Sequence, residues 1–216
     1  EVRTEKKISL ARIANEWTLL AVIWHVVTAA AIAALVGGWR PTKRLGAALL
    51  AVPLFSVSTL AFVEANPFNG LVFAVAGVTL GGLALRVPAE RVCRGLLWAQ
   101  LIGIAMIGYA WLYPHFLEGG NWATYLYAAP LGLLPCPTTS MVIGFGLLAG
   151  GFGDRSWSLV VGGLGMFYAL FGAFVLGVTL DLGLLVGAAA MLVVAFTPSE
   201  QGPDRSETEA AASPFV

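Results

Sequence analysis

The stretch 130–140 concentrates the groups in this chain that could do chemistry. It reads Pro-Leu-Gly-Leu-Leu-Pro-Cys-Pro-Thr-Thr-Ser, which puts three prolines, the thiol of Cys136 and three hydroxyls inside an apolar run. A thiolate is a nucleophile and a ligand for soft cations such as Cu(I). Each proline removes a backbone donor and interrupts a helix. Because freed carbonyls in hydrocarbon need protein groups or trapped water as partners, we expect this stretch to line a cavity or to lie buried in a bundle.

Cys136 stands between two prolines, and this position sets its expected chemistry. Proline suits the first position of a helix, so Pro137 predicts a half-helix that continues from Thr138 with Cys136 as its cap. The positive end of that helix would favour the thiolate, whereas burial among apolar groups would oppose it. A reactive thiol and an inert cysteine beside a proline kink are both compatible with the sequence.

A few other residues join Cys136 as candidates. His25 lies about eight residues into the first apolar run, where a histidine is either functional or hydrogen-bonded to a neighbouring helix. The candidate binding residues are Cys136, Thr138, Thr139, Ser140, His25 and Asn66, and Cys136 is also the candidate metal ligand. No catalytic residue is indicated.

Composition sets the class of protein that must position these residues. Hydrophobic residues make up 58% of the chain, charged residues make up 11%, and the mean hydropathy is +0.84. Soluble domains carry roughly 25% charged residues, so the composition predicts an integral membrane protein whose first partner is the lipid bilayer. Twelve basic and twelve acidic residues cancel, which leaves no basic field for nucleic acid.

Uninterrupted apolar runs predict an all-α polytopic helical bundle of about seven transmembrane helices over 17–196. The fifth run is the longest and contains the prolines, so we expect a broken fifth helix that resumes near Thr138. The runs are 17–37, 45–63, 68–85, 92–113, 123–148, 157–177 and 178–196.

The two ends of the chain differ from the bundle. Residues 1–16 space Leu10, Ile13, Ala14 and Trp17 on one helical face, which predicts an amphipathic helix on the bilayer surface or a fraying start of the first span. Residues 197–216 are rich in Ser, Glu, Pro and Ala, and this composition is typical of a disordered tail.

The basic residues predict a multi-pass protein of the cell membrane. Lys and Arg gather in the loops around 40–44, 86–94 and 155, so the positive-inside rule puts the N-terminus outside and the tail in the cytoplasm. Arg3, Lys6, Lys7 and Arg12 count against this orientation. Asp181 falls in an outer loop between the last two runs, and no acidic residue lies unambiguously at mid-bilayer for a proton relay.

Several classes of protein lack their signatures here. The sequence has no Gly-rich phosphate loop, dinucleotide fingerprint or zinc-protease helix, and it indicates no cofactor. Lys6, Lys7 and Lys43 all lie outside the seventh run, which excludes a retinal Schiff base. A thiol enzyme would need a second cysteine within reach of Cys136, so the sequence favours a protein that is not an enzyme.

A resemblance supports the architecture. The chain resembles a bacterial family of small, uncharacterised polytopic membrane proteins from its first apolar run to about Leu148. The shared motifs, in order, are Asn66-Pro67, Tyr113-Pro114 and Pro135-Cys136-Pro137-Thr138-Thr139. The chain departs after Thr139, where Ser140 and Val142 replace an apolar residue and a further hydroxyl. The resemblance implies a role for Cys136, Thr138 and Thr139 and supplies no activity.

Two functions from different classes remain open. The first is transport or conduction of a small solute or soft metal ion through a cavity at the broken fifth span. The second is a non-catalytic membrane subunit or scaffold, which would pack against a membrane protein partner or a second copy through faces rich in the chain's 26 glycines. A hydrated cavity beside Cys136 would favour transport, and a thiol packed dry would favour the subunit.

Overall fold

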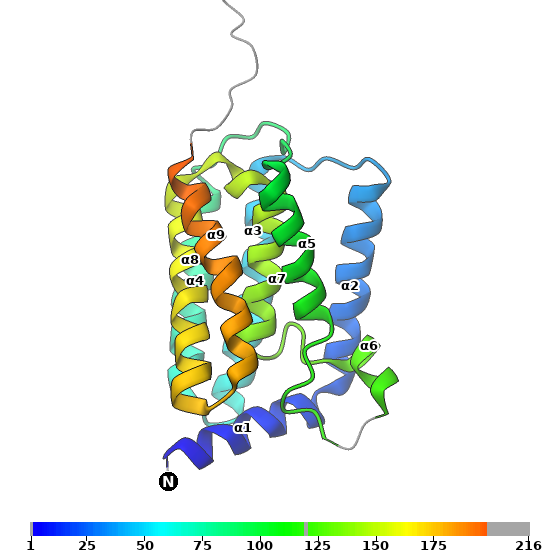
Figure 1. Ribbon diagram of the computed structural model, residues 1–216, viewed down its shortest axis with the longest axis vertical. Coiled ribbons are helices and arrows are strands. Elements are labelled where there is room, and N and C mark those ends of the chain that lie inside the picture. Colours follow the sequence, from blue (N-terminus) through cyan, green and yellow to red (C-terminus); the bar gives the residue numbers. More distant parts are fainter. Residues whose placement is uncertain (1, 119–120, 198–216) are drawn as a thin grey trace, which may run out of the picture.

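The computed structural model describes residues 2–118 and 121–197, and within these ranges the chain is a helical bundle without strands (Figure 1). The prediction of an all-α bundle is confirmed. The tail predicted as disordered lies outside the described residues, Thr197 excepted. The helices are α1 (Val2–Glu16), α2 (Thr18–Val36), α3 (Lys43–Val63), α4 (Pro67–Ala84), α5 (Leu97–Trp111), α6 (Tyr125–Ala128), α7 (Pro135–Leu148), α8 (Arg155–Leu170) and α9 (Gly183–Phe196). Three short 3-10 helices are η1 (Trp122–Thr124), η2 (Gly150–Gly153) and η4 (Thr179–Leu182), and the π-helical segment η3 (Phe171–Leu176) continues α8.

Within the described ranges, five helical segments are long and apolar enough to cross a membrane. They are Thr18–Val36, Lys43–Val63, Pro67–Ala84, Arg155–Leu176 and Thr179–Phe196. The helices α5 and α7 are apolar but shorter, with 15 and 14 residues. The chain is therefore compatible with a multi-pass integral membrane protein.

Helix α7 forms the centre of the bundle. All of its residues except Phe145 and Leu148 are buried, because α3, α5, α8 and α9 all pack around it. Gly103 of α5 and Gly144 of α7 meet backbone to backbone, and a Cβ at either one would press on the carbonyl oxygen of the other. Small residues at such a crossing let two helices approach closely, as membrane helices commonly do.

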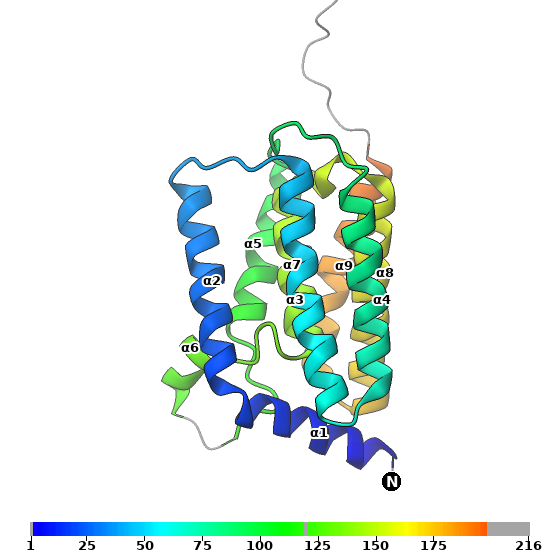
Figure 2. The same cartoon turned by 180° about the vertical axis from the view of Figure 1, so that it is seen from behind.

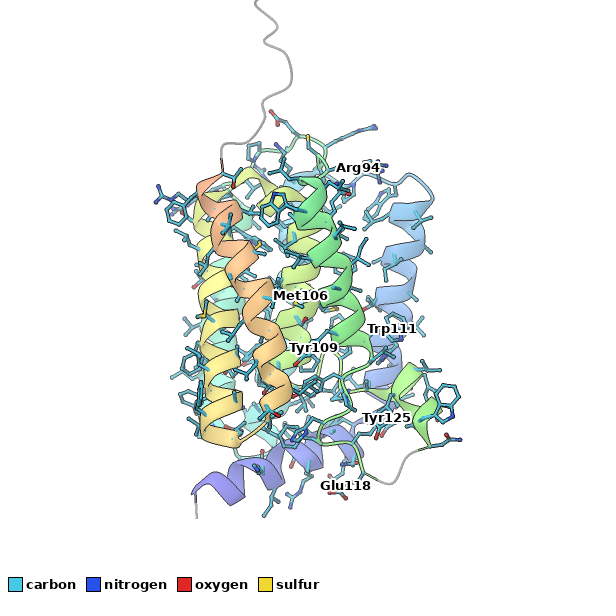
Figure 3. The ribbon with its side chains drawn as sticks, in the orientation of Figure 1. Arg94, Met106, Tyr109, Trp111, Glu118 and Tyr125 are labelled. Atoms are coloured by element: carbon cyan, nitrogen blue, oxygen red, sulfur yellow. The ribbon has the colours of Figure 1, made fainter. Side chains whose placement is uncertain are left out.

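The basic loops share one end of the bundle. Lys43 pairs with Glu90 at 3.1 Å, and Thr42 forms an isolated backbone bridge with Arg91, so the 37–42 and 85–96 connections lie side by side (Figure 2). Arg155 lies over the ring of Phe196 at this same end, where α9 finishes. Figure 3 places Arg94 here and Glu118 at the opposite end.

Helix α1 crosses the other end of the bundle (Figure 1). Leu10, Ile13 and Ala14 are buried, so the apolar stripe predicted from the sequence packs against the other helices. α1 is separate from α2, since the backbone turns at Trp17 between them. This observation favours a distinct helix over a fraying start of the first span.

The fifth predicted span is interrupted between α6 and α7. The amides of Leu133 and Leu134 both donate to the carbonyl of Pro130, which makes a turn in place of a helix, and Gly132 has a φ of 74°. A Cβ at Gly132 would overlap the indole of Trp24. Proline, glycine and the packing of Trp24 therefore set the break, and the helix resumes at Pro135.

Candidate functional site at the start of helix α7

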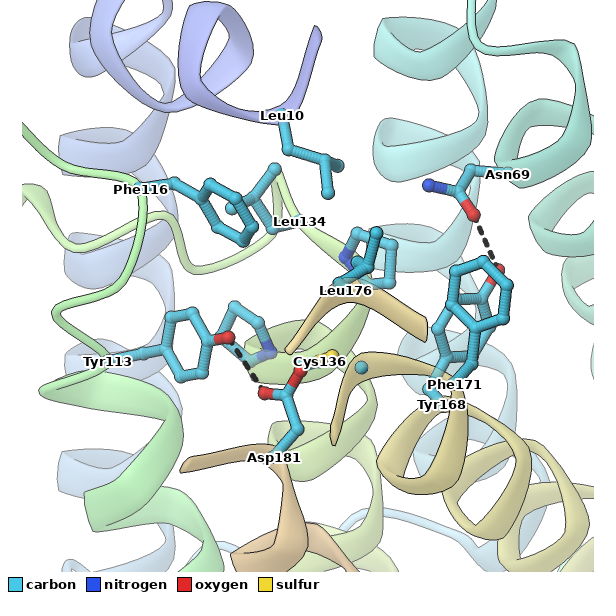
Figure 4. Close-up of a pocket in the computed structure, with 13 residues that line it drawn as sticks. Leu10, Asn69, Tyr113, Phe116, Leu134, Cys136, Tyr168, Phe171, Leu176 and Asp181 are labelled. Carbon is cyan, nitrogen blue, oxygen red and sulfur yellow. Dashed lines mark hydrogen bonds between the residues drawn. The ribbon is translucent and has the colours of Figure 1, made fainter. Parts of the chain in front are cut away.

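A small cavity lies between the start of α7 and the cover formed by α1 (Figure 4). Its volume is about 20 Å³, which is room for about one water molecule. The side chains that can hydrogen-bond or carry charge at this cavity come from five separate segments. They are Asn69, Tyr113, Cys136, Tyr168 and Asp181.

The first turn of α7 brings Cys136 to this cavity. Leu134 is the N-cap and Pro135 the first helical residue, so Cys136 lies inside the first turn and does not cap the helix, contrary to the sequence prediction. The reason is that Pro135 suits the first helical position as well as Pro137 does. Neither proline has an N–H, and the Thr138 amide bonds to Leu134, so Cys136 supplies the free amide of this turn.

Asp181 lies in the connection between α8 and α9, as the sequence predicts, but it is not a solvated loop residue. Its side chain is fully buried beside Cys136. The chain between α8 and α9 folds inward through η3 and η4, with Gly177 in the left-handed region at φ 71°. The inward turn carries Asp181 from the expected loop into the cavity, and the bundle therefore contains the buried carboxyl that the sequence appeared to lack.

Two tyrosines hold one oxygen of this carboxyl. The hydroxyl of Tyr113 donates to Oδ1 of Asp181 at 2.7 Å, and the hydroxyl of Tyr109 lies 3.3 Å from the same atom. The other oxygen, Oδ2, is buried and has no hydrogen-bond partner among the described residues. Oδ2 packs against the backbone of Gly172, where a Cβ would overlap it. Figure 4 shows the Cys136 sulfur beside this carboxyl, so the thiol is the neighbouring donor, and a buried carboxyl in this position can bind a proton.

The charge environment of Asp181 comes from helix ends. Cys136 lies in the first turn of α7, and Asp181 comes two residues before Gly183, the first residue of α9. Helix N-termini carry a partial positive charge and so favour an anion nearby. The cavity therefore combines burial, which favours the neutral acid, with two helix ends that favour the carboxylate.

The far wall of the cavity uses another hydrogen-bonded pair. The hydroxyl of Tyr168 donates to Oδ1 of Asn69 at 3.0 Å, and both residues are buried. The ring of Tyr168 packs on Phe73 with centroids 5.1 Å apart. This pair ties α4 to α8 and places an amide and a phenol opposite Asp181.

Helix α1 and the 112–118 segment cover the outer side of the cavity. Leu10 and Phe116 line it from these two segments. The Ser9 hydroxyl donates to the Glu64 carbonyl at 3.0 Å, and Asn15 bonds the Phe116 carbonyl at 2.9 Å. His115 next to Phe116 has a pKa lowered by burial and, secondarily, by the charge of Lys7. The cover is thus attached by polar contacts at the bundle surface.

Three of the predicted site residues lie on α7 but do not line this cavity. Thr138 and Thr139 are fully buried, and neither hydroxyl has a hydrogen-bond partner among the described residues. Ser140 donates to the carbonyl of Met106 at 2.8 Å and so joins α7 to α5. Of the α7 candidates, the structure brings Cys136 alone to the cavity.

The remaining two predicted residues also lie elsewhere. His25 is buried, with Nδ1 2.8 Å from the Ala21 carbonyl and Nε2 3.2 Å from the Trp111 carbonyl, so it links α2 to the end of α5. Asn66 is the N-cap of α4, where its side chain accepts from the amide of Asn69. Asn69, one turn further along, reaches the cavity instead.

Few further metal ligands lie around Cys136, the residue predicted to bind a metal ion. Among the described residues, no group of three or more His, Cys, Asp and Glu side chains is placed to hold a metal ion. Cys136 and Asp181 would supply two ligands. The arrangement is better suited to binding a proton than a metal ion. One carboxyl is enough to bind a proton, and the cavity has room for about one water molecule.

One signal in the sequence could have found Asp181. It is the single acidic residue between Asp154 and Glu200, and long apolar runs lie on both sides of it. An ionisable residue surrounded by apolar sequence is a functional candidate by default. Tyr109 and Tyr113 gave no comparable signal, because tyrosines near span ends are common membrane anchors.

The site and bundle were compared with known proteins. No family model, curated protein or solved structure matches the chain. The resemblance stated for the Asn-Pro and Pro-Cys-Pro-Thr-Thr motifs stays a prediction.

Proposed function

We propose that this chain is a seven-pass integral protein of the cell membrane that moves protons, alone or with a small solute, through the cavity at the start of α7. One observation carries the proposal: the fully buried Asp181 has one oxygen held by tyrosine hydroxyls and one without a partner among the described residues. Burying a carboxyl in a membrane bundle costs free energy, and ionisable residues inside such bundles therefore usually mark functional sites.

Seven passes require α5 and α7 to cross with the five longer helices. At 1.5 Å per residue the 15 residues of α5 extend about 22 Å, which is short of a hydrocarbon core of about 30 Å. The 112–118 segment continues the chain beyond α5, and four other helices pack around α7. Interrupted helices of this kind are tolerated where protein surrounds them.

The orientation in this proposal follows the ends of the bundle. The loops with Arg44, Arg91 and Arg94 lie together at the end where α9 finishes, which we assign to the cytoplasm. The end with α1, Glu118 and the cavity then faces outward. Asp181 would exchange its proton with the outer side when α1 and Phe116 move, and with the inner side through the bundle.

The described state of the cavity is closed in this mechanism. The approximately 20 Å³ available beside Asp181 accommodates about one water and no larger solute. Tyr113 and Tyr109 hold Oδ1, so proton transfer would take place at Oδ2. Opening would have to displace Leu10 and Phe116 to admit a solute.

Proton movement can be measured directly. The chain would be reconstituted in liposomes that contain a pH-sensitive dye, and a pH gradient would be imposed with and without a membrane potential. We expect faster internal pH change than in empty liposomes, and we expect Asp181→Asn to return the rate to that of empty liposomes. The control is Glu16→Gln, since Glu16 is exposed and does not line the cavity.

Two outcomes would contradict proton movement. One is a wild-type rate equal to that of empty liposomes, and the other is an Asp181→Asn rate equal to wild type.

Ag(I) added outside the liposomes tests whether the site binds a soft metal ion. This experiment uses a Cys93→Ser background, which removes the exposed thiol. If Cys136 takes part, Ag(I) will bind with release of the thiol proton, and Cys136→Ser will abolish that release.

The alternative function, a non-catalytic membrane subunit, is favoured by a different observation. Gly81 and Gly82 of α4 and Gly163 of α8 have open space around them, in contrast to Gly144 at a crossing. Open glycines permit another helix to approach. The test is the oligomeric state in mild detergent. A stable complex or homo-oligomer that dissociates in the Gly82→Leu or Gly163→Leu variant would support the subunit function, and a monomeric wild-type chain would oppose it.

A further inference from the structure

Helix α2 separates from the bundle along its second half. Among the described residues, its side-chain hydrogen bonds to other helices lie no further along than Thr28: Trp24 donates to Ser56 at 3.1 Å and Thr28 contacts the sulfur of Met141 at 3.3 Å. Beyond this point α2 diverges from α3 and α5 (Figure 2). The result is a groove that opens toward the end of the bundle where the basic loops lie.

The groove is large and mostly apolar. Its volume is about 560 Å³, within the range of about 300–1,000 Å³ typical of ligand clefts. Leu35 of α2, Leu49 of α3 and Ile104 of α5 line its walls. Leu49 and Ile104 are 48% and 59% exposed, so the described chain leaves these walls uncovered. Apolar walls inside a membrane suit a hydrocarbon chain.

The mouth of the groove is positively charged. Arg40 and Arg94 line it, and no Asp or Glu side chain does so among the described residues. Arg40 uses Nη1 on the carbonyls of Leu35 and Trp39, at 3.0 and 3.2 Å. Arg94 is exposed and has no hydrogen bond or ion pair within the described part of the chain. Two guanidinium groups above an apolar groove call for an anion at headgroup depth.

We propose that this groove binds an anionic phospholipid, with one acyl chain between α2, α3 and α5 and the phosphate beside Arg40 and Arg94. Basic pockets between helices on the cytoplasmic side attract anionic headgroups, and guanidinium binds phosphate through two parallel hydrogen bonds. Trp39 at the mouth is 45% exposed and suits the interface. Charge favours this occupant over a partner helix, which would leave the two arginines without a counter-charge. The inference does not depend on proton movement.

Retention of lipid by the purified chain tests the proposal. The protein in detergent would be incubated with equal amounts of phosphatidylglycerol and phosphatidylcholine, and native mass spectrometry would count the bound molecules of each. We expect one phosphatidylglycerol in preference to phosphatidylcholine. Each arginine near the membrane surface is worth about fivefold in affinity, so Arg40→Gln with Arg94→Gln should lower the preference by about 25-fold.

Two further variants make the result specific. Arg86→Gln removes an exposed arginine outside the groove and should keep the preference. Leu49→Trp narrows the groove with both arginines intact and should lower retention of both lipids. Equal binding of the two lipids, unchanged preference in the double arginine variant, or a second copy of the chain that occupies the groove and excludes lipid would each overturn the proposal.

Discussion

The hydroxyl of Tyr113 donates a 2.7 Å hydrogen bond to Oδ1 of Asp181, which lies 68 residues later in the chain. This bond joins the end of α5 to the turn before α9 inside the bundle, beside Cys136 at the start of α7. Phenol donors satisfy one carboxyl oxygen and leave the other free, so the pair both anchors Asp181 and preserves its capacity to bind a proton.

Removing this hydroxyl should destabilise the chain. Leaving a buried acceptor without its partner costs about 1–3 kcal/mol, and Tyr113→Phe deletes the shorter of the two bonds to Asp181. We expect lower thermal stability in detergent and a non-additive effect with Asp181→Asn. Tyr168→Phe is the matched control, since that hydroxyl bonds to Asn69 and should show no coupling to Asp181. Additive Tyr113 and Asp181 effects would argue against the pair.

Gly172→Ala should displace the carboxyl of Asp181. The added Cβ would overlap Oδ2, and overpacking of a buried site typically costs about 1–3 kcal/mol. The unfolding temperature should fall, and the proton movement attributed to Asp181 should slow. Gly163→Ala has open space in the same helical segment and should leave both quantities unchanged. A wild-type proton rate in Gly172→Ala would mean that the position of Oδ2 does not matter.

Gly132→Ala should disrupt the break before α7. Its φ of 74° is costly for a residue with a Cβ, by roughly 1–2 kcal/mol, and the Cβ would also strike the ring of Trp24. The stability loss should exceed that estimate. Gly81→Ala is the comparison, because nothing lies near that position and alanine is the better helix former. Equal melting temperatures for the two variants would contradict a strained turn at Gly132.

Helix α1 should control access to Cys136. In a Cys93→Ser background Cys136 is the only thiol of the chain, and a small membrane-permeant maleimide should label it slowly. Leu10→Ala opens the cavity cover and should speed labelling several-fold. Ile8 lies on the same helix and is 56% exposed, so Ile8→Ala should leave the labelling rate unchanged. Equal rates in the two variants would place the entry route elsewhere.

The orientation can be read from two exposed positions at opposite ends. Single cysteines in place of Glu118 and Pro88, in a background that carries both Cys93→Ser and Cys136→Ser, would be treated in intact cells with an impermeant maleimide. The positive-inside assignment expects labelling at position 118 and none at position 88 until the cells are opened. The reverse labelling pattern would mean that the N-terminus lies in the cytoplasm and the basic loops lie outside.

The sequence alone determined the class of architecture and the place where its regularity fails. Hydropathy is a property of contiguous residues, so apolar runs predicted the helices, and the prolines predicted the interruption before α7. The stripe of Leu10, Ile13 and Ala14 likewise predicted α1. These features depend on local backbone chemistry and on burial of one helical face.

Only the tertiary structure decided which polar groups meet. Cys136 had a strong local signal, but its partners Asp181 and Tyr113 come from the ends of other helices, and η3 and η4 turn Asp181 inward. Asn66 and His25 had signals of their own, yet they serve as a helix cap and as a link between helices. Local sequence sets whether a residue is apolar, charged or helix-breaking, whereas the meeting of distant side chains depends on how the helices pack and where the chain between them turns.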